Sequence, residues 1–208
     1  MEPGARALVV VSHPDHMSFN HALAGRIAAG FADAGLEVDL LDLHAVGFDP
    51  CLTLEEARGQ ASSDPLVRAE IVRLTQAVAL GVVHPNCWGA PPAMMKGWMD
   101  RVFAPEAAYS FEKGADAGDT PRGLLRIRAA LVLNTSNTPP LREHEVFGDP
   151  LEAIWRKCLL NYCGISDVER RTFSVLALAT GAERAAWLAQ AEAQAAEIGR
   201  RALDGAGR

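Results

Sequence analysis

Short apolar stretches alternate with longer amphipathic stretches along this chain. The apolar stretches predict strands at 7–12, 37–43, 77–83, 129–135 and 172–179. The amphipathic, often Ala-rich stretches predict helices at 19–34, 65–75, 92–103, 150–161 and 182–202. Strands that alternate with helices form parallel sheets, because each helix carries the chain back across a face of the sheet. The pattern therefore predicts an α/β fold: a doubly wound, five-stranded parallel sheet with helices on both faces.

The alternation is interrupted by neither a linker nor an internal repeat, so we expect one domain spanning 1–208. The segment 104–123 is rich in glycine and charge and fits no regular element. Long irregular segments inside a compact domain are often functional. We therefore expect this segment to contribute to a site or an interface.

The composition of the chain bears on its partners, on the state of its cysteines and on its location in the cell. The net charge is -6, and no dense cluster of Lys and Arg is present, which argues against nucleic acid. The four cysteines lack C-x-x-C spacing, which favours reduced thiols over a disulfide framework. No stretch approaches the roughly 18 apolar residues of a membrane span, and the start of the chain does not resemble a signal peptide. We expect a cytoplasmic protein without membrane insertion.

Three polar loops, 13–20, 85–91 and 134–138, follow predicted strands. In doubly wound sheets, ligands bind beyond the carboxyl ends of the strands, at the point where the strand order reverses. We therefore expect the functional site to be built from these three loops.

The first loop is compatible with two kinds of ligand, and one of them is a metal. His13, Asp15 and His16 carry the N and O atoms that zinc prefers. His-Pro-Asp after a first strand also resembles the zinc-dependent deacetylases whose pattern is His-Pro-Asp-Asp. Here the fourth residue is His16, and only His84 and His144 are candidates for a distant ligand. The metal hypothesis is the weaker one, and we expect no metal.

The second kind of ligand is a phosphate. Ser18 would cap the following helix, leaving the amides of Phe19 and Asn20 at its positive end to face an anion. Neither G-x-G-x-x-G nor a Walker lysine is present, so nucleotide-binding folds of those types lose support. His13 and Asn20 have a plainer interpretation as residues that only tie a tight turn together.

The second loop, PNCWGAPP, combines a Trp, a Gly and rigid prolines at the end of a strand. Such a loop can lay backbone amides along the edge of a flat heteroaromatic ring without obstruction by side chains. A single Trp more often packs in a core than contacts a cofactor. The neighbours of Trp88 favour the cofactor interpretation.

Two segments, SHPDHMSFNHAL at 12–23 and PNCWGAPPAMMKGWMDRVFAPEAAYSF at 85–111, carry a family resemblance. They resemble the flavodoxin-like NAD(P)H:quinone oxidoreductases, the group that includes DT-diaphorase and modulator of drug activity. With the inferred strand order, the resemblance covers most of the chain. It implies a noncovalent flavin, two-electron transfer from NAD(P)H to quinones or similar acceptors, and a homodimer. A flavin-binding regulatory subunit of a membrane transport system stays open as an alternative.

The resemblance also implies roles for individual residues. Those that would hold the flavin phosphate are His13, Ser18, Phe19 and Asn20. Those that would follow the isoalloxazine edge are Pro85, Asn86, Cys87, Trp88 and Gly89. Those that would meet its other polar end are Asn134, Thr135, Ser136, Asn137 and Thr138. Substrate-binding aromatics contributed across the dimer would be Tyr109 and Phe111.

The sequence departs from the family at two points. Ser136-Asn137 stands where a Gly-Gly pair usually lets the ring approach, and no Tyr and His pair that would assist hydride transfer is evident. His144 is the catalytic candidate. We expect FMN rather than FAD, since no aromatic or basic cluster is clearly placed for an adenine, and NAD(P)H as co-substrate.

Overall fold

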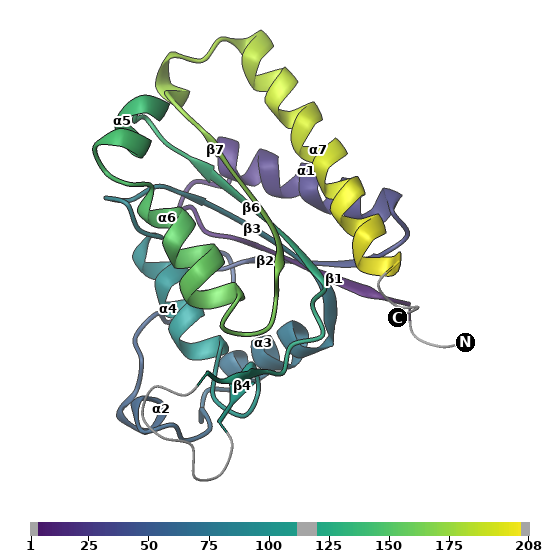
Figure 1. Ribbon diagram of the computed structural model, residues 1–208, viewed down its shortest axis with the longest axis vertical. Coiled ribbons are helices and arrows are strands. Elements are labelled where there is room, and N and C mark those ends of the chain that lie inside the picture. Colours follow the sequence, from purple (N-terminus) through teal and green to yellow (C-terminus); the bar gives the residue numbers. More distant parts are fainter. Residues whose placement is uncertain (1–3, 112–119, 205–208) are drawn as a thin grey trace.

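The centre of the molecule is a five-stranded parallel sheet in the order β2-β1-β3-β6-β7 (Figure 1). The computed structural model describes residues 4–111 and 120–204. The strands are β1 (Arg6–Val11), β2 (Glu37–Asp42), β3 (Ala77–Pro85), β6 (Ala129–Thr135) and β7 (Asp167–Phe173). This order reverses between β1 and β3, which confirms the predicted doubly wound α/β arrangement.

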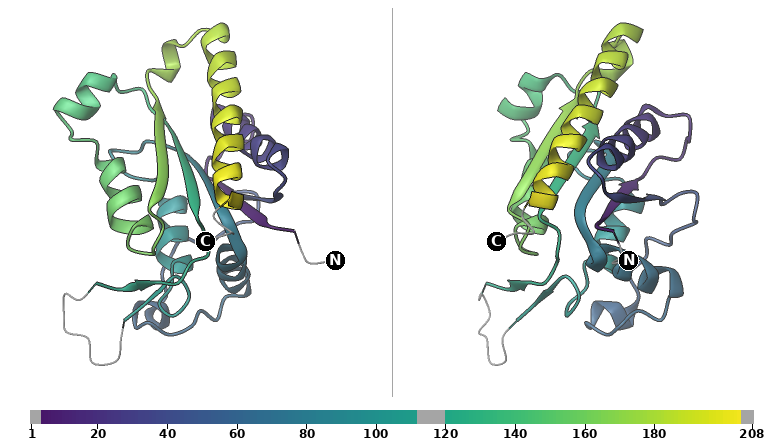
Figure 2. Two further views of the ribbon diagram at one scale, coloured as in Figure 1. Left: turned by 45° about the vertical axis from the view of Figure 1, so that its right-hand side comes forward. Right: turned by 90° about the vertical axis from the view of Figure 1, so that its right-hand side faces the viewer.

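Helices cover both faces of the sheet, and each face has its own apolar core (Figures 1 and 2). One face is covered by α1 (Phe19–Asp33) and α7 (Gly181–Asp204). The other is covered by α3 (Pro65–Gln76), α4 (Ala93–Val102) and α6 (Pro150–Glu152) with the π-helix η1 (Ala153–Leu160). The shorter helices are α2 (Leu54–Ala57), α5 (Pro140–Glu145) and the 3-10 turn η2 (Leu176–Leu178).

The close packing of α1 on α7 depends on Gly30. A Cβ at this position would lie 2.3 Å from the carbonyl oxygen of Glu192. No side chain fits at that distance, so the glycine lets the two helix backbones touch. The contact fixes the position of α1, whose N-terminus faces the edge of the sheet where the loops gather.

The fifth strand was predicted in the wrong place. The prediction was 172–179, whereas β7 spans Asp167–Phe173. This strand lies at an edge of the sheet and carries charged side chains such as Glu169 and Arg171, so its apolar signal is weak. The apolar run that follows it forms η2 instead, on the surface, where Leu178 is 81% exposed.

Two other segments also differ from the prediction. The single helix expected at 150–161 begins with α6 and continues as the wider π-helix η1. The segment 104–123, which fitted no regular element, contains β4 (Tyr109–Ser110) and β5 (Arg122–Gly123), paired antiparallel. Its part at 112–119 lies outside the described residues. The other four predicted helices agree with α1, α3, α4 and α7 to within a few residues.

The carboxyl ends of the strands meet at one edge of the sheet. Val11 pairs with Asp42 and with Val83, and Thr135 pairs with Phe173. The loops that follow these strands are therefore neighbours, as the sequence predicted. Over the described ranges, no helix has the length and apolarity that crossing a membrane requires.

Candidate functional site

A cavity of about 390 Å³ opens at this edge of the sheet. It is lined by parts of the three predicted loops and by residues that follow β7. The lining residues are His13, Met17, Ser18, Phe19, Asn20, Pro85, Asn86, Thr135, Ser136, Asn137, Leu176 and Arg184. Of the residues predicted to hold a cofactor, Cys87, Trp88, Gly89, Asn134 and Thr138 do not line it.

The N-terminus of α1 forms one end of the cavity. Ser18 caps the helix by accepting a hydrogen bond from the amide of His21 at 3.4 Å. The first amides of a helix have no acceptor within it, so those of Phe19 and Asn20 stay available to a ligand. Asn20 is buried, and its side-chain oxygen accepts a hydrogen bond from the hydroxyl of Thr135 at 3.1 Å. This bond holds the helix end against β6.

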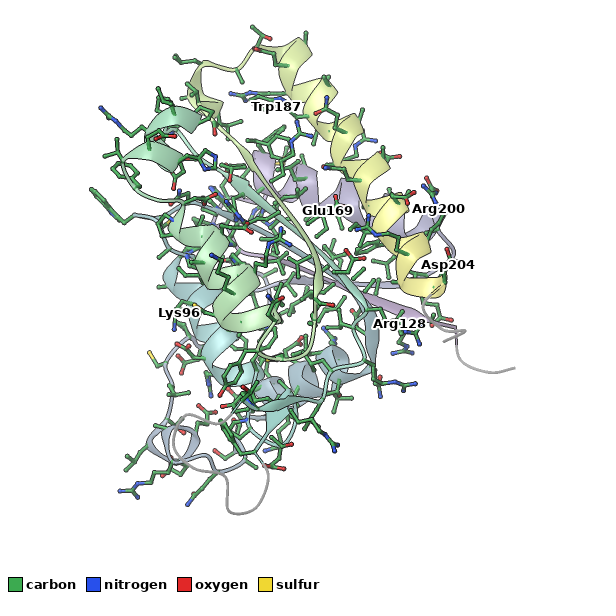
Figure 3. All side chains as sticks on the ribbon, in the orientation of Figure 1. Lys96, Arg128, Glu169, Trp187, Arg200 and Asp204 are labelled. Carbon is green, nitrogen blue, oxygen red and sulfur yellow. The ribbon has the colours of Figure 1, made fainter. Side chains whose placement is uncertain are left out.

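An aromatic group also fixes the start of α1. The ring of Phe19 packs edge-on against Phe173 at 6.2 Å and against Trp187 at 6.1 Å. Trp187 belongs to α7 and is labelled in Figure 3. The helix terminus is therefore held between β6 and α7. Its amides and its positive dipole end form a preorganised position for an anion.

Arg184 on α7 brings a positive charge to the same cavity. Its Nη2 donates to the carbonyl of Leu176 at 3.0 Å. Its Nε is buried and has no hydrogen-bond partner within the described part of the chain. A buried donor without an acceptor is costly, so this guanidinium suits a ligand that accepts hydrogen bonds. The residues present therefore fit a phosphate group.

The loop after β3 is a tight turn held by its own side chain. Asn86 accepts the amide of Gly89 at 2.8 Å and donates from its side-chain nitrogen to Glu143 at 3.2 Å. Backbone hydrogen bonds of 2.9 and 3.0 Å join Cys87 and Ala90 across the turn. Only Pro85 and Asn86 of this loop reach the cavity.

Trp88 and Gly89 at the tip of the turn both have positive φ angles, 58° and 76°. The side chain of Trp88 is fully exposed. A Cβ on Gly89 would lie 2.7 Å from Cγ of Pro150, so protein already fills the space beside this glycine. Burial raises the pKa of the Cys87 thiol. Contact of these residues with a flavin ring stays a prediction.

The loop after β6 is tied into its own backbone. The amide of Thr138 donates to the hydroxyl of Ser136 at 3.0 Å, and the amide of Ala177 donates to the side chain of Asn137 at 2.9 Å. Ser136 and Asn137 stand where the family usually has a Gly-Gly pair, and the hydrogen bonds of their side chains fix the conformation of the loop. Asn134 turns toward the interior and is fully buried.

A buried polar network lies beneath these loops, and His84 is at its centre. Its Nδ1 lies 2.8 Å from the carbonyl oxygen of Pro85, while Nε2 lies 2.8 Å from the indole nitrogen of Trp155 and 3.0 Å from the Asn134 amide nitrogen. A carbonyl only accepts and an indole N–H only donates, so the hydrogen is on Nδ1. Burial lowers the pKa of His84 to about 4, so the ring is neutral at pH 7. Arg170 extends the network by donating to Asn134 at 3.0 Å.

His144, the catalytic candidate, lies outside this cavity. Its side chain is 63% exposed, and its Nδ1 is 3.7 Å from Asp149. Together with Glu143 and Arg170 it lines a different cavity of about 550 Å³. Arg170 forms ion pairs there with Asp149 and with Glu152. The catalytic role of His144 stays a prediction.

Tyr109 and Phe111 form a partly exposed aromatic cluster with a third residue, Tyr162. Their rings meet nearly perpendicularly, with centroids 5.1–6.5 Å apart. Burial raises the pKa of Tyr109, while Phe111 is 48% exposed. The cluster is remote from the cavity: β4, which contains Tyr109, lies at the lower end of the molecule, whereas α7, which contributes Arg184 of the cavity near its start, begins at the upper end (Figures 1 and 2).

Sequence reasoning missed four of these residues: Met17, Leu176 and Arg184 of the cavity and Tyr162 of the aromatic cluster. Leu176 and Arg184 were not predicted because the fifth strand was expected at 172–179, too far along the chain. That prediction put Leu176 inside a strand and left only two residues before the last helix. With β7 ending at Phe173, the segment up to Arg184 falls at the carboxyl edge. Tyr162 lies two residues after η1, directly beyond the predicted helix 150–161, and no pattern in the sequence singled it out.

The metal hypothesis finds no support. Among residues 4–111 and 120–204, no group of three His, Cys, Asp or Glu side chains is placed to hold a metal ion. His84, one of the two proposed distant ligands, is already occupied by the buried network.

The chain belongs to the family described as flavodoxin-like fold, which matches residues 5–198. An uncharacterized NAD(P)H oxidoreductase from Haemophilus influenzae is 31% identical over 173 residues, which cover 80% of this chain and 82% of that protein. NAD(P)H dehydrogenase (quinone) 1 from Cavia porcellus is 25% identical over 186 residues, covering 79% of this chain and 66% of that enzyme. A solved structure from Streptococcus mutans has a TM-score of 0.80 and 28% identity, covering 93% of this chain and 100% of that one. These relationships confirm the resemblance on which the sequence interpretation was based.

Proposed function

We propose that this chain is a flavin-dependent NAD(P)H oxidoreductase that passes two electrons to quinones or similar flat acceptors. The observation that carries the proposal is a cavity where the first amides of α1 meet the Nε of Arg184, which has no hydrogen-bond partner among the described residues. The named relatives support it, since they are NAD(P)H oxidoreductases and a quinone dehydrogenase. The comparisons lend no support to the regulatory subunit or to the deacetylase.

The proposed cofactor is FMN. Its phosphate would accept hydrogen bonds from Ser18, from the amides of Phe19 and Asn20, and from Arg184. Its ring would lie toward Pro85, Asn86 and the segment 135–137, which line the rest of the cavity. When bound, the flavin accepts two electrons from NAD(P)H and passes them to the acceptor. FMN is proposed over FAD because the sequence has no aromatic or basic cluster clearly placed for an adenine.

The residues of the chain itself would position the flavin and fix the shape of the cavity around it. The network around His84 holds the carbonyl of Pro85, and the Asn86 side chain holds the turn that follows. The hydrogen bonds within the loop after β6 fix Ser136 and Asn137. A rigid cleft of this kind holds a flat ring in one orientation and limits the access of water.

We also propose a cytoplasmic homodimer in which the aromatic cluster of one subunit closes the site of the other. Exposed clusters of large aromatic side chains usually mark a contact surface. Tyr109, Phe111 and Tyr162 are too remote from the cavity of their own chain to contact its ligand. A two-fold partner would bring the equivalent cluster to each cavity.

Flavin binding and electron transfer test the proposal directly. Purified protein soaked with FMN should retain about one flavin per chain. Anaerobic NADH or NADPH should bleach the visible flavin absorbance, and added quinone should restore it. Bound flavin that neither nucleotide reduces would overturn the oxidoreductase. Stoichiometric zinc without flavin retention, even after soaking with FAD, would favour the deacetylase instead.

A further inference from the structure

Three side chains form a hydrogen-bonded chain at the phosphate-binding end of α1. The hydroxyl oxygen of Ser18 lies 2.9 Å from Nδ1 of His21, and Nε2 of His21 lies 2.9 Å from Oδ2 of Asp42. Ser18 and His21 belong to the start of α1, while Asp42 ends β2. The side chains of His21 and Asp42 are only 16% and 20% exposed. The geometry therefore links the helix cap to a largely buried carboxylate.

Asp42 is held as a carboxylate. Its Oδ1 accepts hydrogen bonds from the amides of His44 and Ala45 at 3.0 and 3.2 Å. Burial by itself raises the pKa of Asp42, but the hydrogen bonds from His21 and from these amides outweigh it, and the pKa is lowered overall. A carboxylate only accepts hydrogen bonds, so Nε2 of His21 carries a hydrogen.

The protonation state of His21 then decides what Ser18 can donate. In neutral His21, Nδ1 has a lone pair, and the Ser18 hydroxyl gives its hydrogen to that nitrogen. In protonated His21, Nδ1–H donates to the Ser18 oxygen instead. The hydroxyl hydrogen is then free for a ligand in the cavity. Ser18 can therefore donate to a phosphate without breaking its bond to His21 only when His21 is charged.

We infer that His21 and Asp42 are positioning residues that couple phosphate binding to uptake of one proton from solvent at His21. The inference rests on the proposed flavin function and adds a property of the same site. Within the described part of the chain, the titratable groups that face His21 are Asp42 from β2, which is hydrogen-bonded to it, and His13, whose ring centroid lies 6.5 Å from that of His21. A phosphate that accepts the Ser18 hydroxyl hydrogen leaves the Ser18 oxygen to accept from Nδ1 of His21, which requires a hydrogen on both ring nitrogens.

Calorimetry measures the coupling without any turnover. Flavin-free protein is titrated with FMN at about pH 8, where histidine is ordinarily neutral, in two buffers of different ionisation enthalpy. The difference in heat should correspond to about one proton taken up per FMN. By linkage, the Kd for FMN should rise about tenfold per pH unit in this range. Riboflavin, which lacks the phosphate, should bind without proton uptake.

Substitutions of His21 and Asp42 test whether His21 is the group that takes up the proton. His21→Gln keeps a donor for Asp42 but cannot titrate, so FMN should bind more weakly, without uptake and without the pH dependence. Asp42→Asn removes the supporting charge and should reduce the uptake. His16→Gln is the matched control, because His16 lies exposed in the same loop, and it should behave as wild type. Far-UV circular dichroism checks the fold of each variant.

Two results would overturn the inference alone: FMN binding to wild type without proton uptake, or uptake that persists undiminished in His21→Gln. Wild-type protein that binds neither FMN nor riboflavin would overturn the proposed function, and the inference with it.

Discussion

His84 is fully buried, yet both of its ring nitrogens have hydrogen-bond partners. The ring replaces the water that the carbonyl of Pro85 and the indole of Trp155 would otherwise need. Leaving such groups unpaired would cost about 1–3 kcal/mol each. Because the partners belong to β3 and η1, one side chain sets the position of the loop against the helix layer below it.

The burial of His84 makes stability depend on pH. Its folded-state pKa is about 4, below the ordinary 6.5, so the unfolded chain binds more protons between these values. Stability is therefore fully present above pH 6.5 and is lost as the pH falls toward 4. We expect a loss of about 2 kcal/mol between about pH 7.5 and pH 5 from this group.

Urea unfolding at the two pH values measures this loss. His84→Phe should be less stable at both, and the difference between wild type and variant should shrink by that amount at the lower pH. If the difference in the free energy of unfolding between wild type and variant were the same at both pH values, a group other than His84 would account for the pH dependence.

Arg184 is the second residue whose charge has a measurable consequence. Hydrogen bonds to charged groups contribute about 1.5–3 kcal/mol, which corresponds to roughly tenfold to hundredfold in affinity. Arg184→Gln should weaken FMN binding by that factor and leave riboflavin binding unchanged, because riboflavin has no phosphate. Fluorescence titration of both flavins provides the comparison. Equal weakening of both ligands would mean that the residue acts on the shape of the cavity.

At the scale of elements, the turn between β3 and α4 is held from two sides. The side chain of Asn86 binds Gly89 from within the turn and Glu143 of α5 from outside it. Pro150, the first residue of α6, lies against Gly89. The helices α5 and α6, which lie far from this turn in the sequence, therefore help to determine its shape.

Gly89→Ala should displace this turn. The new Cβ would collide with Pro150, and the positive φ of 76° adds strain of about 1–2 kcal/mol. We expect loss of flavin retention with the far-UV circular dichroism unchanged. Gly47→Ala is the control, because Gly47 has a similar φ of 65° but nothing within 4 Å of the added atom.

A second substitution, Pro150→Ala, separates the effect of the collision with Pro150 from that of the backbone strain at Gly89. Pro150→Ala removes the atom nearest to the new Cβ, so Gly89→Ala with Pro150→Ala should recover part of the flavin binding. Flavin loss of the same size in the Gly47 control would contradict this explanation.

At the scale of the whole molecule, β4 with Tyr109 lies at the opposite end from the start of α7, whose Arg184 lines the cavity (Figure 1). A shared site would need the cavity of one subunit and the cluster of the other. This arrangement can be tested with two variants, each of which is defective in a different half of the site.

The first variant carries Tyr109→Ala, Phe111→Ala and Tyr162→Ala, and the second carries Gly89→Ala. Each alone should turn over quinone poorly. Each mixed dimer contains one site with both halves intact and one with both halves defective. Random pairing makes about half of the dimers mixed, so turnover should recover to about a quarter of wild type. Unfolding and refolding the two variants together, followed by light scattering and an activity assay, provides the measurement. Recovery no greater than the sum of the separate activities would exclude a shared site.

Much of this organisation could be predicted from the sequence. The apolar runs of β1, β3 and β6 are almost wholly buried, so their pattern is strong and their following loops were placed correctly. β7 is an edge strand with charged residues, which made its pattern weak and concealed Arg184. His21 and Asp42 were not predicted because their pairing depends on how the start of α1 packs beside the end of β2. A side-chain network such as that of His84 depends on tertiary packing, which no local pattern encodes.

The charges of the edge strands also bear on how the protein behaves in concentrated solution. β2 and β7 each have only one neighbour in the sheet, so their outer backbone groups would be open to a strand from another molecule. Asp167 and Glu169 of β7 bind Arg201 of α7, and Asp39 of β2 binds Arg73 of α3 (Figure 3 labels Glu169). A foreign strand would have to align beside these ion pairs. The same charges that obscured β7 in the sequence should therefore protect the folded protein from aggregation through its sheet edges.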